Sequence, residues 1–162
     1  MRVMAVDYGD ARTGVAVSDE TGTLTGDAWV IVSKDRAEIV KTLVTEAQIR
    51  GVSAVVVGYP MNMDGSLGPR AALSEQFAEL LREQIAAVQQ DTHETRIMRN
   101  APGQYAAMEV ILWDERMTTV SANRILTESG RFGKKRKKTV DAVAASLILE
   151  GYLLRMRDMR NR

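Results

Sequence analysis

The sequence predicts an α/β protein built on one mixed five-stranded sheet with helices packed against it. Apolar segments at residues 2–8, 13–19 and 28–33 follow one another closely. Their pattern and short connections indicate a three-strand antiparallel meander. Two more strands, at residues 54–57 and 110–113, alternate with helical segments. This alternation predicts that the second half of the sheet is parallel and is covered by helices.

The first two helices are predicted by apolar residues at helical spacing. The first helix contains Ile39, Val40, Leu43, Val44 and Ala47, and the second contains Leu73, Phe77, Leu80, Leu81, Ile85 and Val88. Gly51 fits the position just beyond the C-terminus of the first helix. Gly22 and Gly26 interrupt the chain before the third strand. Residues 58–69 form a loop with three Gly and two Pro, and the polar residues 89–107 are expected to be irregular.

The C-terminal part is predicted to contain two helices separated by a basic loop. Residues 119–129 have a helical pattern that Gly130 would end, and residues 131–138 are strongly basic. Thr139 can cap the final helix. The apolar face of that helix contains Val140, Val143, Ala144, Leu147 and Ile148.

Length and composition favour a single cytoplasmic domain over residues 1–162. The 162 residues can bury a core that needs no covalent staples. The absence of Cys excludes disulfides, thiol nucleophiles and cysteine metal sites, and it suits a reducing cytosol. No apolar segment approaches the length of a membrane span, and the N-terminus lacks the apolar stretch of a signal peptide. We therefore expect no membrane association.

The charge is distributed unevenly, although the net charge is only +1. Residues 131–162 contain ten Lys or Arg and three acids, whereas residues 1–130 contain twelve Lys or Arg and eighteen acids. A basic end on an otherwise acidic chain predicts a polyanionic partner.

Acidic residues stand at three separate places that the predicted topology would bring together. Asp7 ends the first strand, Asp114 and Glu115 end the last, and Asp141 lies in the first turn of the final helix. Sites in open α/β sheets form outside the carboxyl ends of the strands. Converging carboxylates repel one another unless a cation lies between them. Each acid also has a structural explanation, as a turn residue, a surface charge or a helix-dipole partner.

Four segments carry a resemblance to a known family. They are Asp7-Tyr8-Gly9 with Arg12 and Gly14, Gly58 to Gly65, Asp114 to Thr119, and Lys137 to Ala145. With the order of elements, they resemble the ribonuclease H-like fold. More specifically, they resemble the YqgF family of pre-16S rRNA nucleases, also described as Holliday junction resolvase-like proteins. Two departures are Tyr59, where an aliphatic residue is more usual, and a longer connection at residues 89–108.

The resemblance implies a nuclease that hydrolyses phosphodiester bonds with Mg²⁺ or Mn²⁺ and processes the 5′ end of precursor 16S ribosomal RNA. Asp7, Asp114, Glu115 and Asp141 would then be both the catalytic and the metal-binding residues. Adjacent residues on a strand point to opposite faces, so only one of Asp114 and Glu115 is expected to face the metal. A metal that activates water removes the need for a side-chain nucleophile, which agrees with the absence of Cys. His93, the only His, is expected to be a loop residue.

Nucleic acid is the partner that the residues around these acids suggest. The family resemblance favours structured RNA as that partner, and DNA is also possible because phosphate contacts are alike for both. The candidate contacts are Arg12, Asn62, Asp64, Arg70, Arg116, Lys134, Lys135, Arg136, Lys137 and Lys138. The alternative for the loop at residues 60–69 is a purely structural turn, and the alternative for the basic segment is a solvated loop. Aromatic content is only 5%, so stacking on bases has little support, and Trp113 is expected in the core.

Three other functions fit parts of the pattern. A DNA junction resolvase cuts symmetrically and would require a homodimer. A non-catalytic nucleic-acid-binding protein could keep the same fold. Asp-x-Gly followed by Thr-Gly also resembles a phosphate motif of actin-like ATP-binding proteins, but that fold needs a duplicated domain, for which 162 residues are too few.

Overall fold

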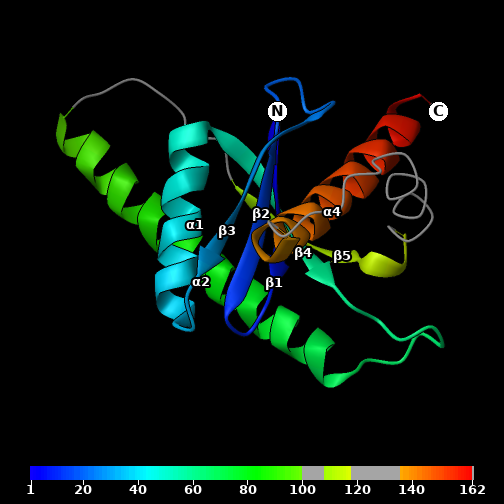
Figure 1. Ribbon diagram of the computed structural model, residues 1–162. Coiled ribbons are helices and arrows are strands. Elements are labelled where there is room, and N and C mark those ends of the chain that lie inside the picture. The colour runs from blue at the N-terminus through cyan, green and yellow to red at the C-terminus, as the bar shows by residue number, and fades with distance from the viewer. Residues whose placement is uncertain (100–107, 118–135, 162) are drawn as a thin grey trace.

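The computed structural model describes residues 1–99, 108–117 and 136–161 (Figure 1). Its strands are β1 (Arg2–Tyr8), β2 (Arg12–Ser18), β3 (Thr25–Val32), β4 (Val52–Tyr59) and β5 (Glu109–Asp114). Its helices are α1 (Arg36–Arg50), α2 (Pro69–Arg99), the short 3₁₀ helix η1 (Glu115–Met117) and α4 (Arg136–Arg160). The strands form one sheet in the order β3-β2-β1-β4-β5. The pairs β1–β2 and β2–β3 are antiparallel, whereas β1–β4 and β4–β5 are parallel, which confirms the predicted mixed sheet.

Helices cover both faces of the sheet, with α1 and α2 on one face and α4 on the other (Figure 1). Alternate residues of each strand therefore enter two separate cores. Met4 and Val6 of β1 pack with Phe77 under α1 and α2. Val3 and Ala5 pack with residues of α4, including Leu149. Since both faces of β1 and β4 are buried, these strands are almost entirely apolar, and a polar residue on them is conspicuous.

The ends of the first helix follow from the residues at its boundaries. The Asp35 side chain accepts hydrogen bonds from the backbone N–H groups of Ala37 and Glu38, and so caps the first turn of α1. Gly51 follows the helix with a φ of 66°, a left-handed conformation that glycine adopts without steric penalty. The predicted position of Gly51 beyond the helix C-terminus is confirmed.

The prediction of an irregular segment from residue 89 onward is wrong as far as residue 99, because α2 continues to Arg99. Residues 89–99 contain no Gly or Pro, so their polarity did not prevent helix formation. His93 therefore lies on a helix and not in a loop. Residues 100–107 lie outside the described part of the chain.

Three further boundaries differ from the sequence predictions. Strand β4 runs from Val52 to Tyr59, so Gly58 and Tyr59 belong to the strand and the loop that follows begins at Pro60. The final helix begins at Arg136, so Thr139 is inside it and residues 136–138 are helical; Lys and Arg are good helix formers. Strand β3 begins at Thr25 and includes Gly26, because pairing of Ser18 with Thr25 extends the ladder beyond an irregularity.

The predicted helix at residues 119–129, its stop at Gly130 and residues 131–135 lie outside the described residues. Within the described helices, none is long and apolar enough to cross a membrane.

Candidate active site

Asp7 lies on the face of the sheet that α4 covers. It alternates with Val3 and Ala5, which belong to the core under α4, and it pairs with Gly14 of β2 across the antiparallel ladder. A Cβ atom on Gly14 would collide with the backbone carbonyl of Asp141. The missing side chain therefore lets the N-terminal part of α4 approach the sheet directly beside Asp7.

Glu115 reaches the same face from the end of β5. A Cβ atom on Gly58 would lie 2.5 Å from Oε1 of Glu115 and 2.7 Å from Cδ1 of Ile148. The Glu115 carboxylate thus occupies the space over Gly58, and the β1–β4 register of Val6 with Val57 makes Gly58 the neighbour of Asp7. Gly14 and Gly58 create the room for these side chains. The sequence predictions gave neither glycine a role in the site. Gly14 could have been noticed as a glycine inside an apolar strand, whereas Gly58 was expected in the loop after the strand.

The carboxyl groups of Asp7, Glu115 and Asp141, which we call the acidic corner, interact electrostatically. Burial, and then the negative charge of Asp141, raise the pKa of Asp7, while Arg70 opposes the shift. Burial, and then the charge of Asp7, raise the pKa of Glu115 to about 7. Arg70 lowers the Glu115 pKa and Asp114 raises it further. The corner therefore disfavours additional negative charge in the absence of a cation.

The chemistry of these donors fits a hard divalent cation, which prefers carboxylate oxygens. Asp7 and Glu115 are partly buried oxygen donors whose repulsion a cation would relieve. Asp141 is close enough to affect Asp7. Among the described side chains, however, no three acidic or imidazole groups already surround a single point. The structure thus supplies an acidic pair with a third carboxylate nearby.

Asp114 has a different environment from Glu115. Arg116 donates hydrogen bonds to both carboxylate oxygens of Asp114, with the shortest at 2.6 Å from Nη2 to Oδ2. These hydrogen bonds lower the pKa of Asp114 below its usual value. Of the two adjacent acids, Glu115 approaches Asp7, and Asp114 is engaged by Arg116.

The predicted contacts in the loop at residues 60–69 hold the loop itself together. Nδ2 of Asn62 donates to Oγ of Ser66 at 2.8 Å. Asp64 accepts hydrogen bonds from the backbone N–H and the hydroxyl of Ser66. Gly65 has a φ of 85°, which favours glycine. These contacts are the ones expected if the loop is a structural turn, the alternative to a loop that contacts nucleic acid. In that explanation Asn62 and Asp64 are turn residues.

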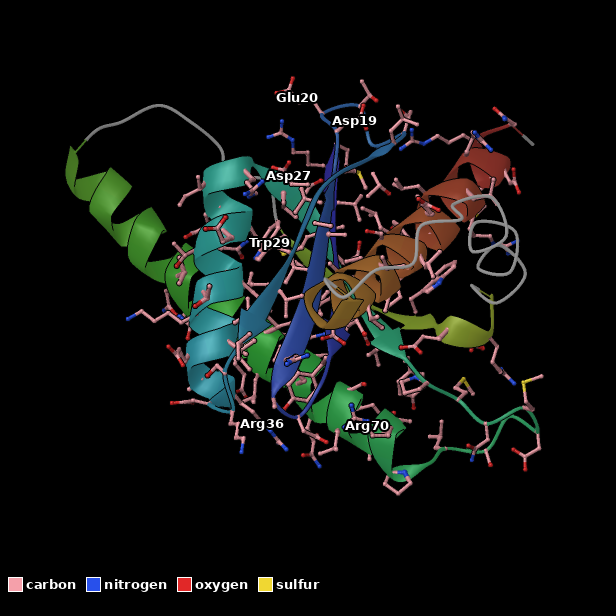
Figure 2. All side chains as sticks on the ribbon, viewed as in Figure 1. Asp19, Glu20, Asp27, Trp29, Arg36 and Arg70 are labelled. Carbon is pink, nitrogen blue, oxygen red and sulfur yellow. The ribbon has the colours of Figure 1, made fainter. Side chains whose placement is uncertain are left out.

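Arg70 lies at the start of α2 (Figure 2), close enough to Asp7 and Glu115 to oppose the rise in the pKa of both. It donates to Asp10 at 2.7 Å and to the backbone carbonyl of Tyr8 at 3.2 Å. Arg12 is exposed at the start of β2. Lys134 and Lys135 lie outside the described residues, and Arg136, Lys137 and Lys138 form the start of α4.

Tyr59 and Trp113 have structural partners. The Tyr59 hydroxyl donates to Glu75 of α2 at 2.5 Å. Trp113 is partly buried in the core under α4 and packs edge-to-face on Tyr152 with ring centroids 5.5 Å apart. The prediction that Trp113 belongs to the core is confirmed.

The raised pKa of Glu115 predicts a pH-dependent loss of stability in metal-free protein. An acid whose pKa is higher in the folded state destabilises that state once it ionises, so its contribution falls as pH rises from about 4.5 to about 7. Glu115→Gln should therefore be more stable than the wild type at pH 8 in chelator, by about 1–2 kcal/mol, which is less than the full pKa shift would give because water still screens the partly exposed carboxylate. The difference should shrink toward pH 4.5. Denaturant unfolding at both pH values measures it, and an equal difference at both would contradict the assigned environment.

Fold and site together define a ribonuclease H-like α/β protein with an acidic corner at the carboxyl ends of β1 and β5. Among the solved structures that share this fold are two Holliday junction resolvases. A Thermus thermophilus RuvC in complex with a Holliday junction substrate matches with a TM-score of 0.54 and 14% identity, covering 96% of each chain. The yeast mitochondrial Holliday junction resolvase Ydc2 matches with a TM-score of 0.56 and 12% identity, covering 98% of this chain and 81% of the other.

The chain belongs to the RuvX (YqgF) family. The family model described as "RuvX: Holliday junction resolvase" matches residues 1–155. A protein of Halothermothrix orenii named "Putative pre-16S rRNA nuclease" is 40% identical over 156 residues, which cover 94% of both chains. A protein of the same name from Acetivibrio thermocellus is 38% identical over 154 residues, covering 94% of this chain and 95% of the relative. The predicted family is confirmed.

Proposed function

We propose that this chain is a metal-dependent nuclease that hydrolyses phosphodiester bonds in the 5′-end processing of precursor 16S ribosomal RNA in the cytoplasm. The observation that carries the proposal is the acidic corner, in which Asp7 and Glu115 share a partly buried position and Asp141 influences Asp7. Membership of the RuvX family supports hydrolysis of nucleic acid. The names of the relatives support the RNA substrate.

Asp7, Glu115 and Asp141 are the residues that would hold Mg²⁺ or Mn²⁺. A bound metal supplies a water of lowered pKa and stabilises charge on the phosphate oxygens. Strand β1 carries Asp7, and the short helix η1 directly after β5 carries Glu115, so both acids stand on regular elements that limit their motion. Arg70 partly offsets the negative charge of both acids. It also ties the turn after β1 to the start of α2 through Asp10.

The basic segment that leads into α4 is the proposed phosphate-binding region. Residues 131–138 contain six Lys or Arg, and the acidic Asp141 follows directly. Contacts from Lys and Arg to phosphate give affinity without reading sequence. A substrate held along this segment would be delivered to the acidic corner.

The proposal is tested with one RNA and one DNA substrate in parallel. Purified protein is incubated with a precursor 16S rRNA fragment and with a four-way DNA junction, each in Mg²⁺, in Mn²⁺ and in EDTA. The proposal expects cleavage of the RNA that depends on the metal. Symmetrical cleavage of the junction alone would favour a dimeric resolvase, which the description of the family model makes the second candidate. Cleavage of neither substrate would contradict the nuclease proposal.

Asp141→Asn distinguishes a nuclease from a passive binder. An acid beside a basic segment repels phosphate, so a binding protein gains nothing from it, whereas a nuclease gains a metal ligand. The variant should lose cleavage by roughly 100-fold or more. Its affinity for nucleic acid in EDTA should be equal or slightly tighter. Single-turnover cleavage and binding in chelator measure the two effects separately. A variant that cleaves normally would remove Asp141 from the proposed site.

A further inference from the structure

Arg116 makes contacts on two sides within the described part of the chain. Nε donates to both carboxylate oxygens of Asp114 at 3.0 Å, and Nη2 donates to Oδ2 at 2.6 Å. On the other side, Nη1 donates to the backbone carbonyl of Asn62 at 3.3 Å, and Nη2 lies 3.7 Å from Sδ of Met61. The guanidinium thus joins the end of β5 to the loop at residues 60–68.

The loop at residues 60–68 is strongly exposed and is closed mainly by short-range contacts. Met61 and Leu67 form an isolated bridge, and Asn62 and Ser66 are joined through the backbone. Met63 and Leu67 are 91% and 56% exposed. A loop with so little apolar burial opens at low cost, and Arg116 supplies it with a contact from a residue more than fifty positions away in the sequence.

The same contacts hold the chain on both sides of Glu115. The Asp114 carboxylate also accepts the backbone N–H of Arg116 at 3.0 Å. Asp114 therefore fixes both the main chain and the side chain of the residue that follows Glu115. The turn held in this way leaves Glu115 over Gly58, beside Asp7.

We propose that Asp114 and Arg116 form a positioning clamp that aims Glu115 into the acidic corner and holds the loop at residues 60–68 against it. This inference rests on the proposed function for the role of Glu115. In this proposal Asp114 is not a metal ligand. Arg116 binds Asp114 and the loop at residues 60–68 and does not contact phosphate.

The clamp orients Glu115 and adds little to the free energy of unfolding of the whole protein. The side chain of Arg116 is 33% exposed and that of Asp114 is 22% exposed, and ion pairs that remain in contact with water add only about 0–1 kcal/mol. The planar fork of Arg can bond a carboxylate and a second acceptor at fixed angles, which Lys cannot do. A Lys at this position would keep the charge and lose the clamp.

The test is a double-mutant cycle with Asp114→Ala, Arg116→Ala and the double variant, together with Arg116→Lys. Each single change should lower kcat by roughly 10–100-fold and leave KM, and the affinity for nucleic acid in EDTA, within about twofold. The double variant should be no worse than the poorer single variant, because both remove one unit. Arg116→Lys should not restore kcat.

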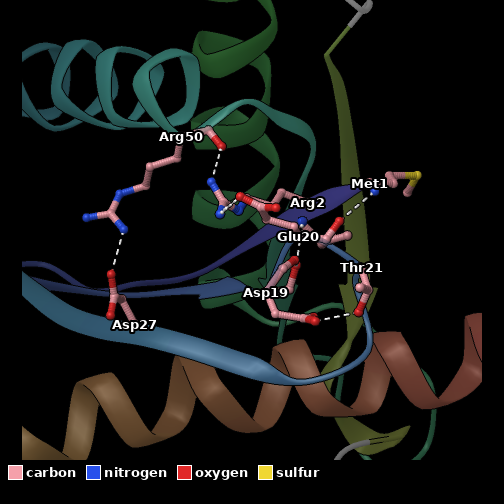
Figure 3. Close-up of polar contacts among 9 residues, drawn as sticks. Met1, Arg2, Asp19, Glu20, Thr21, Asp27 and Arg50 are labelled. Carbon is pink, nitrogen blue, oxygen red and sulfur yellow. Dashed lines mark hydrogen bonds and ion pairs between the residues drawn. The ribbon is translucent and has the colours of Figure 1, made fainter.

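A second measurement, amide hydrogen exchange over residues 60–68, needs no activity. Exchange there should accelerate in both alanine variants and in Arg116→Lys. Arg50→Ala is the matched control. It removes an Arg that pairs with Asp27 at 2.8 Å at the other end of the sheet (Figure 3), so it should leave the loop unchanged.

Three results would overturn the clamp. One is unchanged exchange over residues 60–68 in Arg116→Ala. Another is weaker binding in EDTA, with the log–log salt slope reduced by about 0.7–0.9 and restored by Arg116→Lys, which would make Arg116 a phosphate contact. The third is additive losses in the double variant. If the wild type cleaves no substrate, the proposed function is wrong. Hydrogen exchange over residues 60–68 then tests the clamp without any measurement of activity.

Discussion

Asp7→Asn should lower metal-dependent cleavage by at least about a thousandfold, which corresponds to about 4 kcal/mol of transition-state stabilisation. The substitution preserves the shape of the side chain and removes the charge that would hold the cation. The fold should persist, because Asp7 makes the folded state less favourable when it is ionised: burial and Asp141 both raise its pKa. In EDTA the variant should therefore unfold at the same temperature as the wild type or at a higher one.

Asp158→Asn is the control for this prediction. Asp158 is an exposed acid on the same helix as Asp141, about 25 Å further along at 1.5 Å per residue. Its removal changes the net charge equally and should leave cleavage within about twofold of the wild type. Wild-type cleavage by Asp7→Asn, or equal losses in the two variants, would show that Asp7 has no special role.

Gly14→Ala should disturb both stability and activity, because the added methyl group would meet the backbone of Asp141 and not a flexible side chain. Overpacking of a buried position costs about 1–3 kcal/mol, and occasionally more. Helix α4 would have to move away from β2, which would carry Asp141 away from Asp7. Thermal unfolding and single-turnover cleavage should both report a loss, and the loss of cleavage should persist at temperatures where the variant is fully folded.

Gly68→Ala provides the comparison for this variant. The nearest atoms to a Cβ at Gly68 are 3.7 and 3.8 Å away, on the Asn62 side chain, which is an ordinary van der Waals distance. Its unfolding temperature should stay close to that of the wild type. If Gly14→Ala were as stable and active as Gly68→Ala, the close approach of α4 to the sheet would not be needed for the site.

The fold could be predicted because its central strands and helix faces have strong periodic patterns. The segment at residues 54–57 is apolar throughout since β4 is buried on both faces, and Gly51 marks a true helix end. Residues 89–99 were missed because a polar helix has no apolar stripe to reveal it. The start of α4 was missed for a related reason: clustered Lys and Arg suggest a solvated loop and are equally compatible with helix.

The sequence predicted which acids gather at the site, but not which of Asp114 and Glu115 faces Asp7. The predicted strand ends place Asp7, Asp114 and Glu115 at one edge of the sheet. Because successive side chains on a strand point to opposite faces, only one of Asp114 and Glu115 was expected to face Asp7. Which one does so depends on the turn after β5, where Arg116 bonds Asp114. That contact joins side chains two residues apart and leaves no periodic signal. The importance of Gly58 depends likewise on the position of Glu115 above it.

The most direct test of this account is an anomalous difference map from crystals of the protein soaked in Mn²⁺. The account predicts a peak among the carboxylates of Asp7, Glu115 and Asp141, lost in crystals of Asp7→Asn. Asp114 should remain bonded to Arg116 and outside the coordination sphere. A peak bound by Asp114 instead of Glu115, or no peak near Asp7 at a Mn²⁺ concentration that supports cleavage, would contradict the account.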